Sequence, residues 1–303
     1  MNRTFTLLGR AALVPDAQLS ATTGPGVDLH HPSAARVYDY LLGGSANWAV
    51  DRTFSAQLLD QFPEIGDIAR ANRQFVNRVV RHLARRGVRQ FVDIGSGVFS
   101  SGNTHQIADD VASGTRVVYV DNEAVAVAHA EILLDQEGDP DRHAVVNADL
   151  RDPKTVWGEA LATGIIDEHE PVAVLMFSVL HALRPAEEDP AAGIMSCYRQ
   201  MMPPGSYLGV SHITDQDVPA ELSEKLVYLK KLSDDWCGNK SYCRSHAAVD
   251  ALLGDFELVR PGMGWITDWH PEEAPRTACN IRFPTANHSI VWAGVGRKPG
   301  FRR

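Results

Sequence analysis

The sequence has few cysteines, no long apolar run and no excess of basic residues. Its four cysteines, among 303 residues, are scattered at Cys197, Cys237, Cys243 and Cys279 and lack the paired spacing of a zinc site. We therefore expect reduced thiols, no bound metal and a cytoplasmic location. No apolar stretch approaches the roughly 18 residues that span a bilayer, so we expect neither membrane insertion nor export.

The charge balance argues against nucleic acid as a partner. The chain carries 29 Lys and Arg against 38 Asp and Glu, a formal net charge of -9, whereas non-specific nucleic-acid affinity depends on clustered cations. The one basic run, RVVRHLARRGVR at residues 78–89, places its arginines at helical spacing among apolar residues. This spacing predicts the solvated face of an amphipathic helix. The composition thus favours a small-molecule substrate.

The composition and the positions of glycine and proline predict one large domain preceded by a loose segment. Residues 1–30 mix proline, glycine and small residues without periodicity, as expected of a flexible leader or arm. From residue 31 to 303 we expect one domain, with a helical cap at 31–87 and a Rossmann-like core at 88–303. The cap begins with a helix that Ser33 can cap and Gly43-Gly44 ends, and two further helices are predicted near 52–61 and 65–86.

The core shows the rhythm of strands that alternate with helices. Short apolar runs recur as VRQFVDIG, TRVVYVDN, HAVVNADL, PVAVLMFSVL, GSYLGVSHI, FELVRPG and HSIVWAGVGRK. Several are apolar at consecutive positions, which is typical of strands buried on both faces. We therefore predict an α/β fold with a mostly parallel seven-stranded sheet. The last two strands are expected to pair antiparallel at one edge, joined by an insertion at 262–287.

A glycine turn directly after the first strand is the best candidate for a cofactor site. In FVDIGSG, Gly95 and Gly97 allow a tight turn and a close approach to a ligand, and Asp93 precedes them. The next two strands end at Asp121 and Asp149, where ligands of open α/β sheets bind. An acid at the first of these positions can accept both ribose hydroxyls of an adenosine, and one at the second can accept an adenine amino group.

The residues of the turn discriminate between two cofactors that contain adenosine. A dinucleotide fingerprint needs a third glycine at the position that Ser100 occupies, and it does not include Asp93. NAD is therefore the weaker alternative. With these residues the chain resembles the class I S-adenosylmethionine (SAM)-dependent methyltransferases, whose acid-x-Gly-x-Gly turn is followed by an acid for ribose and an Asp for adenine. Phe99 departs from this pattern, since a third glycine is frequent there.

A closer resemblance extends over residues 31 to 298. The strings HPSAARVYDYLLGG, ARANRQF, QFVDIGSG with GNTH, RVVYVDN, NADLRDP, SVLHAL and PPGSYLGVSH are similar to the family known simply as S-adenosyl methyltransferases. The resemblance implies a class I fold and SAM as cofactor, but it implies no particular acceptor. By this likeness the cofactor-binding candidates are Asp93, Gly95, Ser96, Gly97, Asp121, Asn122, Asp149, Leu150, Ser178, Arg70 and Asn72.

Each of these residues also has a structural alternative. Asp93 can fix the turn, and Asp149 can cap the helix that follows it. Asn122 and Leu150 are expected to wall the adenine ring. Arg70, Asn72 and Arg73 precede the first strand, where one of them would hold the SAM carboxylate or simply face solvent.

Catalytic candidates follow the fourth and fifth strands. His181, near Ser178 in MFSVLHAL, is a candidate general base because a histidine pKa near 6.5 suits neutral pH. His212 is a second candidate. Both histidines have the alternative of a packed, hydrogen-bonded role.

Aromatic residues supply candidates for the acceptor pocket. The cap contributes Tyr38, Tyr40 and Trp48, and the insertion contributes Trp265 and Trp269. The insertion is expected either to line this pocket or to seal a homodimer.

We thus predict a SAM-dependent methyltransferase that acts on a small molecule. Methyl transfer needs little acid–base help when the nucleophile is good, because alignment supplies most of the rate. One alternative is another use of SAM on the same fold, by aminocarboxypropyl transfer or by cyclisation that releases methylthioadenosine. A non-catalytic SAM-binding module is the other.

Overall fold

The computed structural model of the chain describes residues 28, 30–98, 102–183, 190–236, 241–275, 278 and 281–300. Nearly all of the predicted leader, the continuation of the glycine turn at 99–101, and Cys237 and Cys279 lie outside the described residues. Within the described residues, no helix has the length and hydropathy that crossing a bilayer requires.

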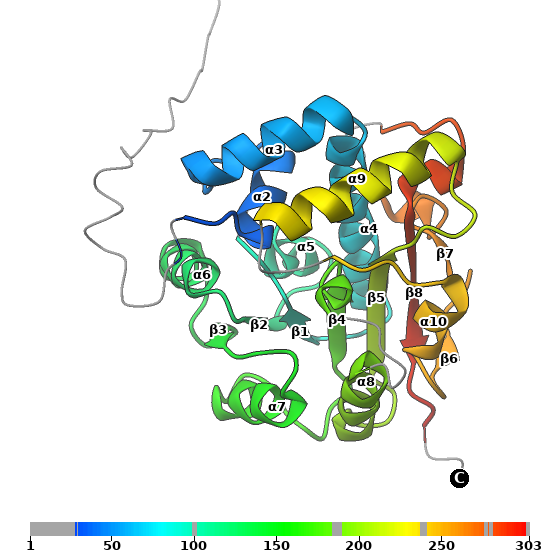
Figure 1. The fold of residues 1–303 in the computed structure, drawn as a ribbon. Helices are drawn as coiled ribbons and strands as arrows, with labels where there is room; N and C mark the ends of the chain where they lie inside the picture. Colours follow the sequence, from blue (N-terminus) through cyan, green and yellow to red (C-terminus); the bar gives the residue numbers. More distant parts are fainter. Residues whose placement is uncertain are drawn as a thin grey trace, which may run out of the picture.

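The described residues form one eight-stranded sheet in the order β3-β2-β1-β4-β5-β8-β6, with β7 also paired to β8 (Figure 1). The first five strands run parallel, whereas β8 is antiparallel to β5, β6 and β7. The strands are β1 Gln90–Ile94, β2 Arg116–Asp121, β3 His143–Asn147, β4 Ala173–Phe177, β5 Tyr207–Ile213, β6 Glu257–Leu258, β7 Gly264–Trp265 and β8 Val291–Arg297. The mostly parallel α/β fold is thus confirmed, as is the antiparallel edge pair formed by β6 and β8.

One strand more is present than the seven expected. Strand β7 comes from within the predicted insertion and pairs Gly264 and Trp265 with Ala293 and Trp292 of β8. A pairing of two residues leaves no periodic signal in the sequence, so the insertion reads as loop.

Helices cover both faces of the sheet. They are α2 Ala34–Leu41, α3 Ala49–Gln61, α4 Ile65–Arg85, α5 Thr104–Asp109, α6 Ala124–Glu137, α7 Pro153–Ala162, α8 Pro190–Met201, α9 Ala220–Trp236 and α10 His246–Ala251, with short 3-10 turns η1 Leu180–Ala182, η2 Pro271–Glu273 and η3 Ala286–Ser289. One buried apolar cluster joins the sheet to α4, α5 and α9, and a second joins it to α7, α8 and α10. Successive residues Phe91 and Val92 enter opposite clusters, which explains the consecutive apolar positions.

The predicted cap divides into two parts: α2 and α3, which with α9 form a roof over the sheet, and α4, which packs against the sheet. Helices α2 and α3 lie with α9 across the top of the sheet as drawn in Figure 1. Ser33 begins α2 as predicted, because its side chain accepts a hydrogen bond from the backbone N–H of Arg36. The predicted helices at 52–61 and 65–86 correspond to α3 and α4. However, α4 buries Phe75, Val79 and Val80 against the sheet and is therefore part of the core.

The strand order reverses between β1 and β4. Strands β2 and β3 follow β1 to one side, whereas β4 and β5 lie on its other side. In open α/β sheets, ligands bind outside the carboxyl ends of the strands at such a switch point.

Candidate functional site

The glycine turn adopts a backbone that only glycine takes readily. Gly95 and Gly97 have φ of +73° and +65°, and the N–H groups of Gly95 and Ser96 donate to the carbonyl of Val120 at 2.8 and 3.3 Å. A Cβ built on Gly95 would lie 2.4 Å from Cγ2 of Val179 in the loop after β4. A Cβ on Gly97 would meet nothing closer than Ala35 Cβ of the cap, at 3.8 Å. The turn therefore packs tightly on one side and leaves open space on the other.

Asp121 is held at the end of β2 by backbone groups. Its two carboxylate oxygens accept from the N–H of Gly97 at 2.8 Å and of Glu123 at 2.9 Å. Burial raises the pKa of Asp121. Among the described residues, the nearby buried hydroxyl of Ser96 has no hydrogen-bond partner. A fixed carboxylate beside an unsatisfied hydroxyl and an open glycine surface fits a ribose ligand.

Asp93 is paired within the protein. Its Oδ2 accepts from Thr104 Oγ1 of α5 at 2.6 Å, and burial raises its pKa. The contact ties the start of α5 to the end of β1, so it gives Asp93 a structural role in the turn. Contact with the cofactor remains a prediction.

The third predicted acid lies at the outer end of the site. Asp149 pairs with Arg151, whose Nε lies 2.9 Å from each carboxylate oxygen, and this partner lowers the pKa of Asp149 to about 2. Asn122 Nδ2 donates to Asp149 Oδ2 at 3.2 Å, and the Leu150 carbonyl accepts from Tyr198. Asn122, Asp149 and Leu150 thus meet where β2 and β3 end, as an adenine subsite requires.

A hydrogen-bonded chain crosses the site from β4 to the cap. Ser178, with φ of +52°, donates its N–H to Ser211 of β5, and Ser211 Oγ donates to Asn72 Oδ1 at 2.8 Å. Asn72 Nδ2 then donates to the hydroxyl of Tyr38 at 3.0 Å. Both polar ends of Asn72 are thus engaged inside the protein, and the side chain is buried. These contacts give Asn72 a structural role, and its predicted contact with the SAM carboxylate stays a prediction.

Of the two arginines before β1, Arg73 lies nearer the glycine turn. It donates to the carbonyl of Gly102 at 2.7 Å, and its charge partly offsets the rise that burial causes in the pKa of Asp93. Arg70, one turn earlier, pairs with Asp67 at 2.7 Å and has 43% of its side chain exposed. Both arginines border a cavity of about 420 Å³ between α4, α6 and the end of α2. Arg73 lies one turn nearer the glycine turn along α4, and this position favours it over Arg70 for a carboxylate.

The two candidate histidines have different surroundings. His181 is half-buried, and its Nδ1 has no hydrogen-bond partner among the described residues. His212 is fully buried, with Nδ1 2.7 Å from the Ile213 carbonyl and Nε2 2.7 Å from Nη1 of Arg244. Both ring nitrogens of His212 are therefore occupied. Its predicted role as a general base is corrected to a structural one.

Arg244 also holds the loop that carries His181. Its guanidinium donates to the carbonyls of Leu180 and Leu183 at 2.9 Å each. Burial, with Arg244 as a second cause, lowers the pKa of His181 to about 4. His181 is thus neutral near pH 7, and its Nδ1 can accept a proton or a hydrogen bond.

The two tryptophans of the insertion lie away from these residues, although Ala274, Pro275 and Ala278 of the same insertion line the cavity beside Arg70 and Arg73. Trp269 is 1% exposed and packs on Phe75 and His82 of α4, with ring centroids 5.6 and 5.3 Å apart. The end of α4 leads within four residues into the start of β1, so His82 marks the amino end of the sheet. Trp265 contacts His246 and Trp292, and β8 separates it from β5. The predicted acceptor pocket therefore does not include Trp269 or Trp265.

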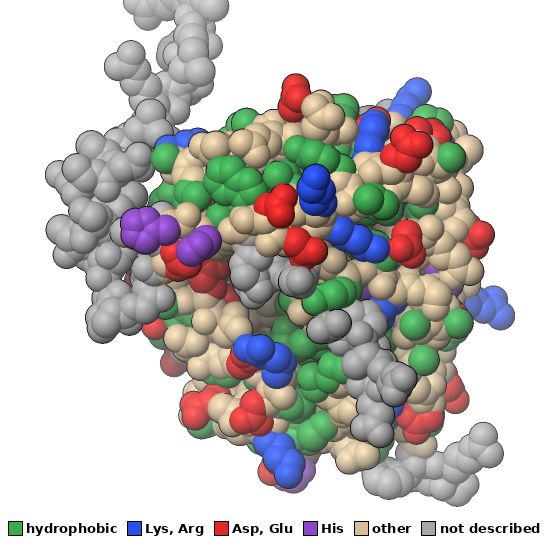
Figure 2. All heavy atoms as spheres, in the orientation of Figure 1, with side chains coloured by type: hydrophobic (Ala, Val, Ile, Leu, Met, Phe, Trp, Pro, Cys, Tyr) green, Lys and Arg blue, Asp and Glu red, His purple; other side chains and the backbone are tan. Residues whose placement is uncertain are grey.

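The cap aromatics Tyr38, Tyr40 and Trp48 are all partly exposed. Tyr38 belongs to the chain described above, and Trp48 stacks on Arg36 with 4.0 Å between Cζ and the ring centroid. Figure 2 shows the surface hollowed below the cap helices on the face drawn. Among the described residues, no group of three or more His, Cys, Asp or Glu side chains is placed to bind a metal.

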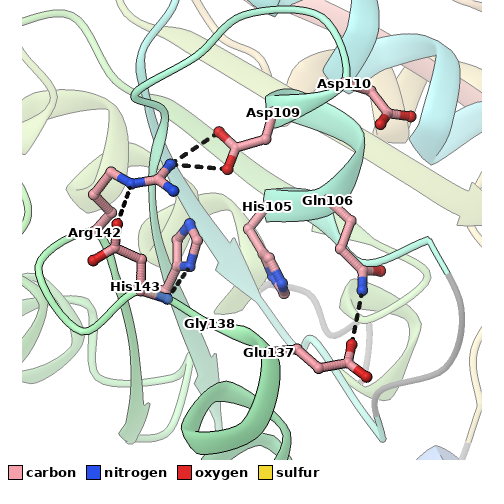
Figure 3. Close-up of a pocket in the computed structure, with 9 residues that line it drawn as sticks. His105, Gln106, Asp109, Asp110, Glu137, Gly138, Arg142 and His143 are labelled. Carbon is pink, nitrogen blue, oxygen red and sulfur yellow. Dashed lines mark hydrogen bonds and ion pairs between the residues drawn. The ribbon is translucent and has the colours of Figure 1, made fainter.

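A second cavity, of about 410 Å³, lies at the opposite end of the sheet, between the ends of α5 and α6 and the start of β3 (Figure 3). His105 and His143 face each other there with ring centroids 4.6 Å apart, and Arg142 joins Asp109 to Asp139. None of the predicted site residues lines this cavity.

Sequence reasoning missed Arg36, Asp51, Glu123 and Arg244. Arg36, Asp51 and Arg244 are charged residues that fold into the interior. For Arg36, the available signal was a cation next to the apolar position Val37 of a short amphipathic helix. For Glu123, the available signal was its position two residues after Asp121, where its backbone N–H can reach the Asp121 carboxylate.

Comparison with known proteins agrees with this geometry. The model of the family described as S-adenosyl methyltransferase matches residues 20–299, whereas no curated protein matches the chain. A candidate methyltransferase from Thermobifida fusca YX is 32% identical, with a TM-score of 0.78 over 91% of this chain and 98% of that one. A DUF574 family protein from Streptomyces avermitilis MA-4680 is 33% identical, with a TM-score of 0.77 over 89% of this chain and 98% of that one.

A more distant likeness concerns the fold alone. An O-methyltransferase family protein from Burkholderia thailandensis is 12% identical, with a TM-score of 0.50 over 82% of this chain and 71% of that one. The family match extends over the cap, the glycine turn and every strand of the sheet. The chain belongs to the S-adenosyl methyltransferase family and is a SAM-dependent methyltransferase of class I fold.

Proposed function

We propose that this methyltransferase acts on a small molecule bound below the cap, at the carboxyl ends of β4 and β5. The observation that carries the proposal is the unpartnered Nδ1 of His181, in the loop that packs against the glycine turn through Val179. The roof of α2, α3 and α9 over this edge favours a confined acceptor (Figure 1). The net charge of -9 disfavours a nucleic-acid acceptor.

The residues that would hold the cofactor come from the ends of three strands. We assign the ribose to Asp121, the adenine to the wall of Asn122, Asp149 and Leu150, and the carboxylate to Arg73. The open face of Gly97 and the Ser96 hydroxyl would lie against the cofactor. When bound, SAM supplies the methyl group on a positively charged sulfur, which is already a good leaving group.

The protein then contributes alignment and one proton acceptor. Holding a nucleophile in line with the methyl group removes the entropy cost of their encounter, which can supply several kcal/mol of barrier lowering. Neutral His181 Nδ1 would accept the proton that an oxygen or nitrogen nucleophile releases. A pKa of about 4 makes His181 a weaker base than the reference value near 6.5 on which it was selected, so alignment carries most of the rate and His181 assists.

The test is product analysis with a small-molecule extract as the source of acceptor. The protein is incubated with SAM, and mass spectrometry follows S-adenosylhomocysteine, methylthioadenosine and methylated products. We expect S-adenosylhomocysteine and one methylated product in equal amounts. Methylthioadenosine would instead indicate aminocarboxypropyl transfer or cyclisation, and SAM binding without any turnover would indicate a binding module.

His181→Asn tests the proton acceptor once an acceptor is identified. We expect kcat to fall by about 10²-fold or more, with the Kd for SAM little changed. His246→Asn is the matched control, because His246 stacks on Trp292 at the sheet edge with centroids 3.8 Å apart. Equal kcat values for the two variants would remove His181 from the mechanism.

A further inference from the structure

A buried ion cluster joins the cap to the residue next to the ribose acid. Arg36 of α2 is 2% exposed, and its Nε donates to Oδ2 of the fully buried Asp51 at 2.6 Å. Its Nη1 donates to Oε1 of Glu123 at 2.8 Å, and the ring of Trp48 lies 4.0 Å from the guanidinium carbon. The cluster thus brings together α2, α3 and the segment that follows β2.

Glu123 connects this cluster to Asp121 through a single residue of backbone. The N–H of Glu123 donates to Oδ1 of Asp121 at 2.9 Å, while its carboxylate accepts from Arg36 and from the hydroxyl of Ser33. Ser33 also begins α2, and its N–H donates to Oδ1 of Asp51 at 2.9 Å. The groups that orient the first turn of the cap are therefore the groups that fix Glu123.

A buried ion cluster of this kind contributes more to orientation than to stability. Asp51 and Glu123 face one arginine, and burial raises the pKa of the Glu123 carboxyl. Apolar residues of similar volume often replace a buried ion pair without loss of stability. Ionic contacts do fix direction, because each oxygen must meet its own donor.

We propose that Glu123 is a positioning residue for cofactor binding, which fixes the cap and the orientation of Asp121 through the Arg36 contact. The inference rests on the ribose role proposed for Asp121. Neither Glu123 nor Arg36 needs to touch the cofactor. The placement of the cap and the orientation of the ribose acid are then coupled, and a change in the cluster alters the affinity for SAM.

The experiment measures the Kd of S-adenosylhomocysteine by calorimetry, with the Tm, for wild type, Glu123→Gln and Asp121→Asn and their double variant. Glu123→Gln keeps the shape of the side chain and removes its charge. We expect Glu123→Gln to raise Kd about tenfold and to have much less effect in the Asp121→Asn background. Such non-additivity is the mark of residues that act as one unit.

Matched variants separate this role from general destabilisation. Arg142 also lies between two carboxylates, Asp109 and Asp139, at the far end of the sheet, so Arg142→Lys is the control for Arg36→Lys. We expect only Arg36→Lys to weaken binding. Ser33→Ala removes one hydrogen bond to Glu123. It replaces Glu123→Gln or Arg36→Lys in the comparison if either of those variants does not fold.

Three results would overturn the proposal. They are an unchanged Kd for Glu123→Gln, additive effects in the double variant, and an unchanged Kd for Asp121→Asn, which would also end the ribose assignment. Failure to find a methylated product would instead count against the proposed acceptor chemistry. It would leave these binding data valid.

Discussion

Gly95→Ala probes the closest contact in the site, between the glycine turn after β1 and the loop after β4. The new Cβ would lie 2.4 Å from Cγ2 and 2.8 Å from Cβ of Val179, closer than any ordinary carbon contact. Val179 is flanked by Ser178 and Leu180, so its displacement would shift the loop that carries His181. The substitution should therefore affect both stability and the site.

The cost has two parts. A non-glycine residue at the φ of +73° seen at Gly95 costs about 1–2 kcal/mol, and forced overpacking adds about 1–3 kcal/mol. We expect Gly95→Ala to lower the free energy of unfolding by about 2–5 kcal/mol. Gly97→Ala carries only the first part, about 1–2 kcal/mol, because its nearest neighbour would be 3.8 Å away.

The variant that is less destabilised, Gly97→Ala, should nevertheless lose affinity for the cofactor. Gly97→Ala fills the open side of the turn, so we expect its Kd for S-adenosylhomocysteine to rise more than tenfold while its Tm falls little. Urea unfolding and calorimetry measure the two effects. Val179→Ala in the Gly95→Ala background removes the contacts to Cγ2 and Cγ1, at 2.4 and 3.3 Å, and leaves the contact to Cβ at 2.8 Å. It should therefore recover about 1–2 kcal/mol.

Equal destabilisation by Gly95→Ala and Gly97→Ala would refute the packing argument. So would strict additivity of Gly95→Ala and Val179→Ala, since the two side chains would then not meet. Unchanged affinity in Gly97→Ala would instead show that the cofactor does not approach this face of the turn.

Two further predictions concern residues outside the site. Burial lowers the pKa of His82 and of His105 to about 4, so between pH 6.5 and 4 the unfolded chain binds protons that the folded chain does not. Stability should fall as pH drops through 6.5, by about 2 kcal/mol per histidine at pH 5, and His105→Asn should lessen the fall; equal urea midpoints at pH 7.5 and 5.0 would contradict this. Trp269→Ala should cost about 3–5 kcal/mol without changing the Kd for S-adenosylhomocysteine, and weakened binding in a still-folded variant would return Trp269 to the site.

The sequence predicted the sheet because consecutive apolar runs are forced on strands buried on both faces. Phe91 and Val92 serve opposite clusters, so both had to be apolar. Strand β7 gave no such signal, since only Gly264 and Trp265 pair. The position of Trp269 was also hidden, because an aromatic residue in a long connection suits a pocket and a core equally well.

Contacts between distant segments set the rest of the site. Arg36 and Glu123 are separated by 87 positions, and neither residue forms a recognisable motif with the other. Arg70 and Arg73 are the same residue type on one face of α4, and only the fold shows that Arg73, one turn further along, lies next to Gly102. His181 follows β4, whereas His212 lies within β5 and not after it as predicted. Arg244 contacts Nε2 of His212, while Nδ1 of His181 has no partner among the described residues.

The acids at the ends of the first three strands show how neighbours decide chemistry within a motif. Asp93 is satisfied by the hydroxyl of Thr104, and Asp149 is paired with the guanidinium of Arg151. Asp121 receives backbone N–H groups from Gly97 and Glu123. Each carboxylate oxygen has two lone pairs, so one hydrogen bond to each oxygen fixes the group and leaves acceptor capacity for two ribose hydroxyls. The same residue type thus braces the turn at position 93 and forms an ion pair at 149, and at 121 it is the ribose-binding group in the function we propose.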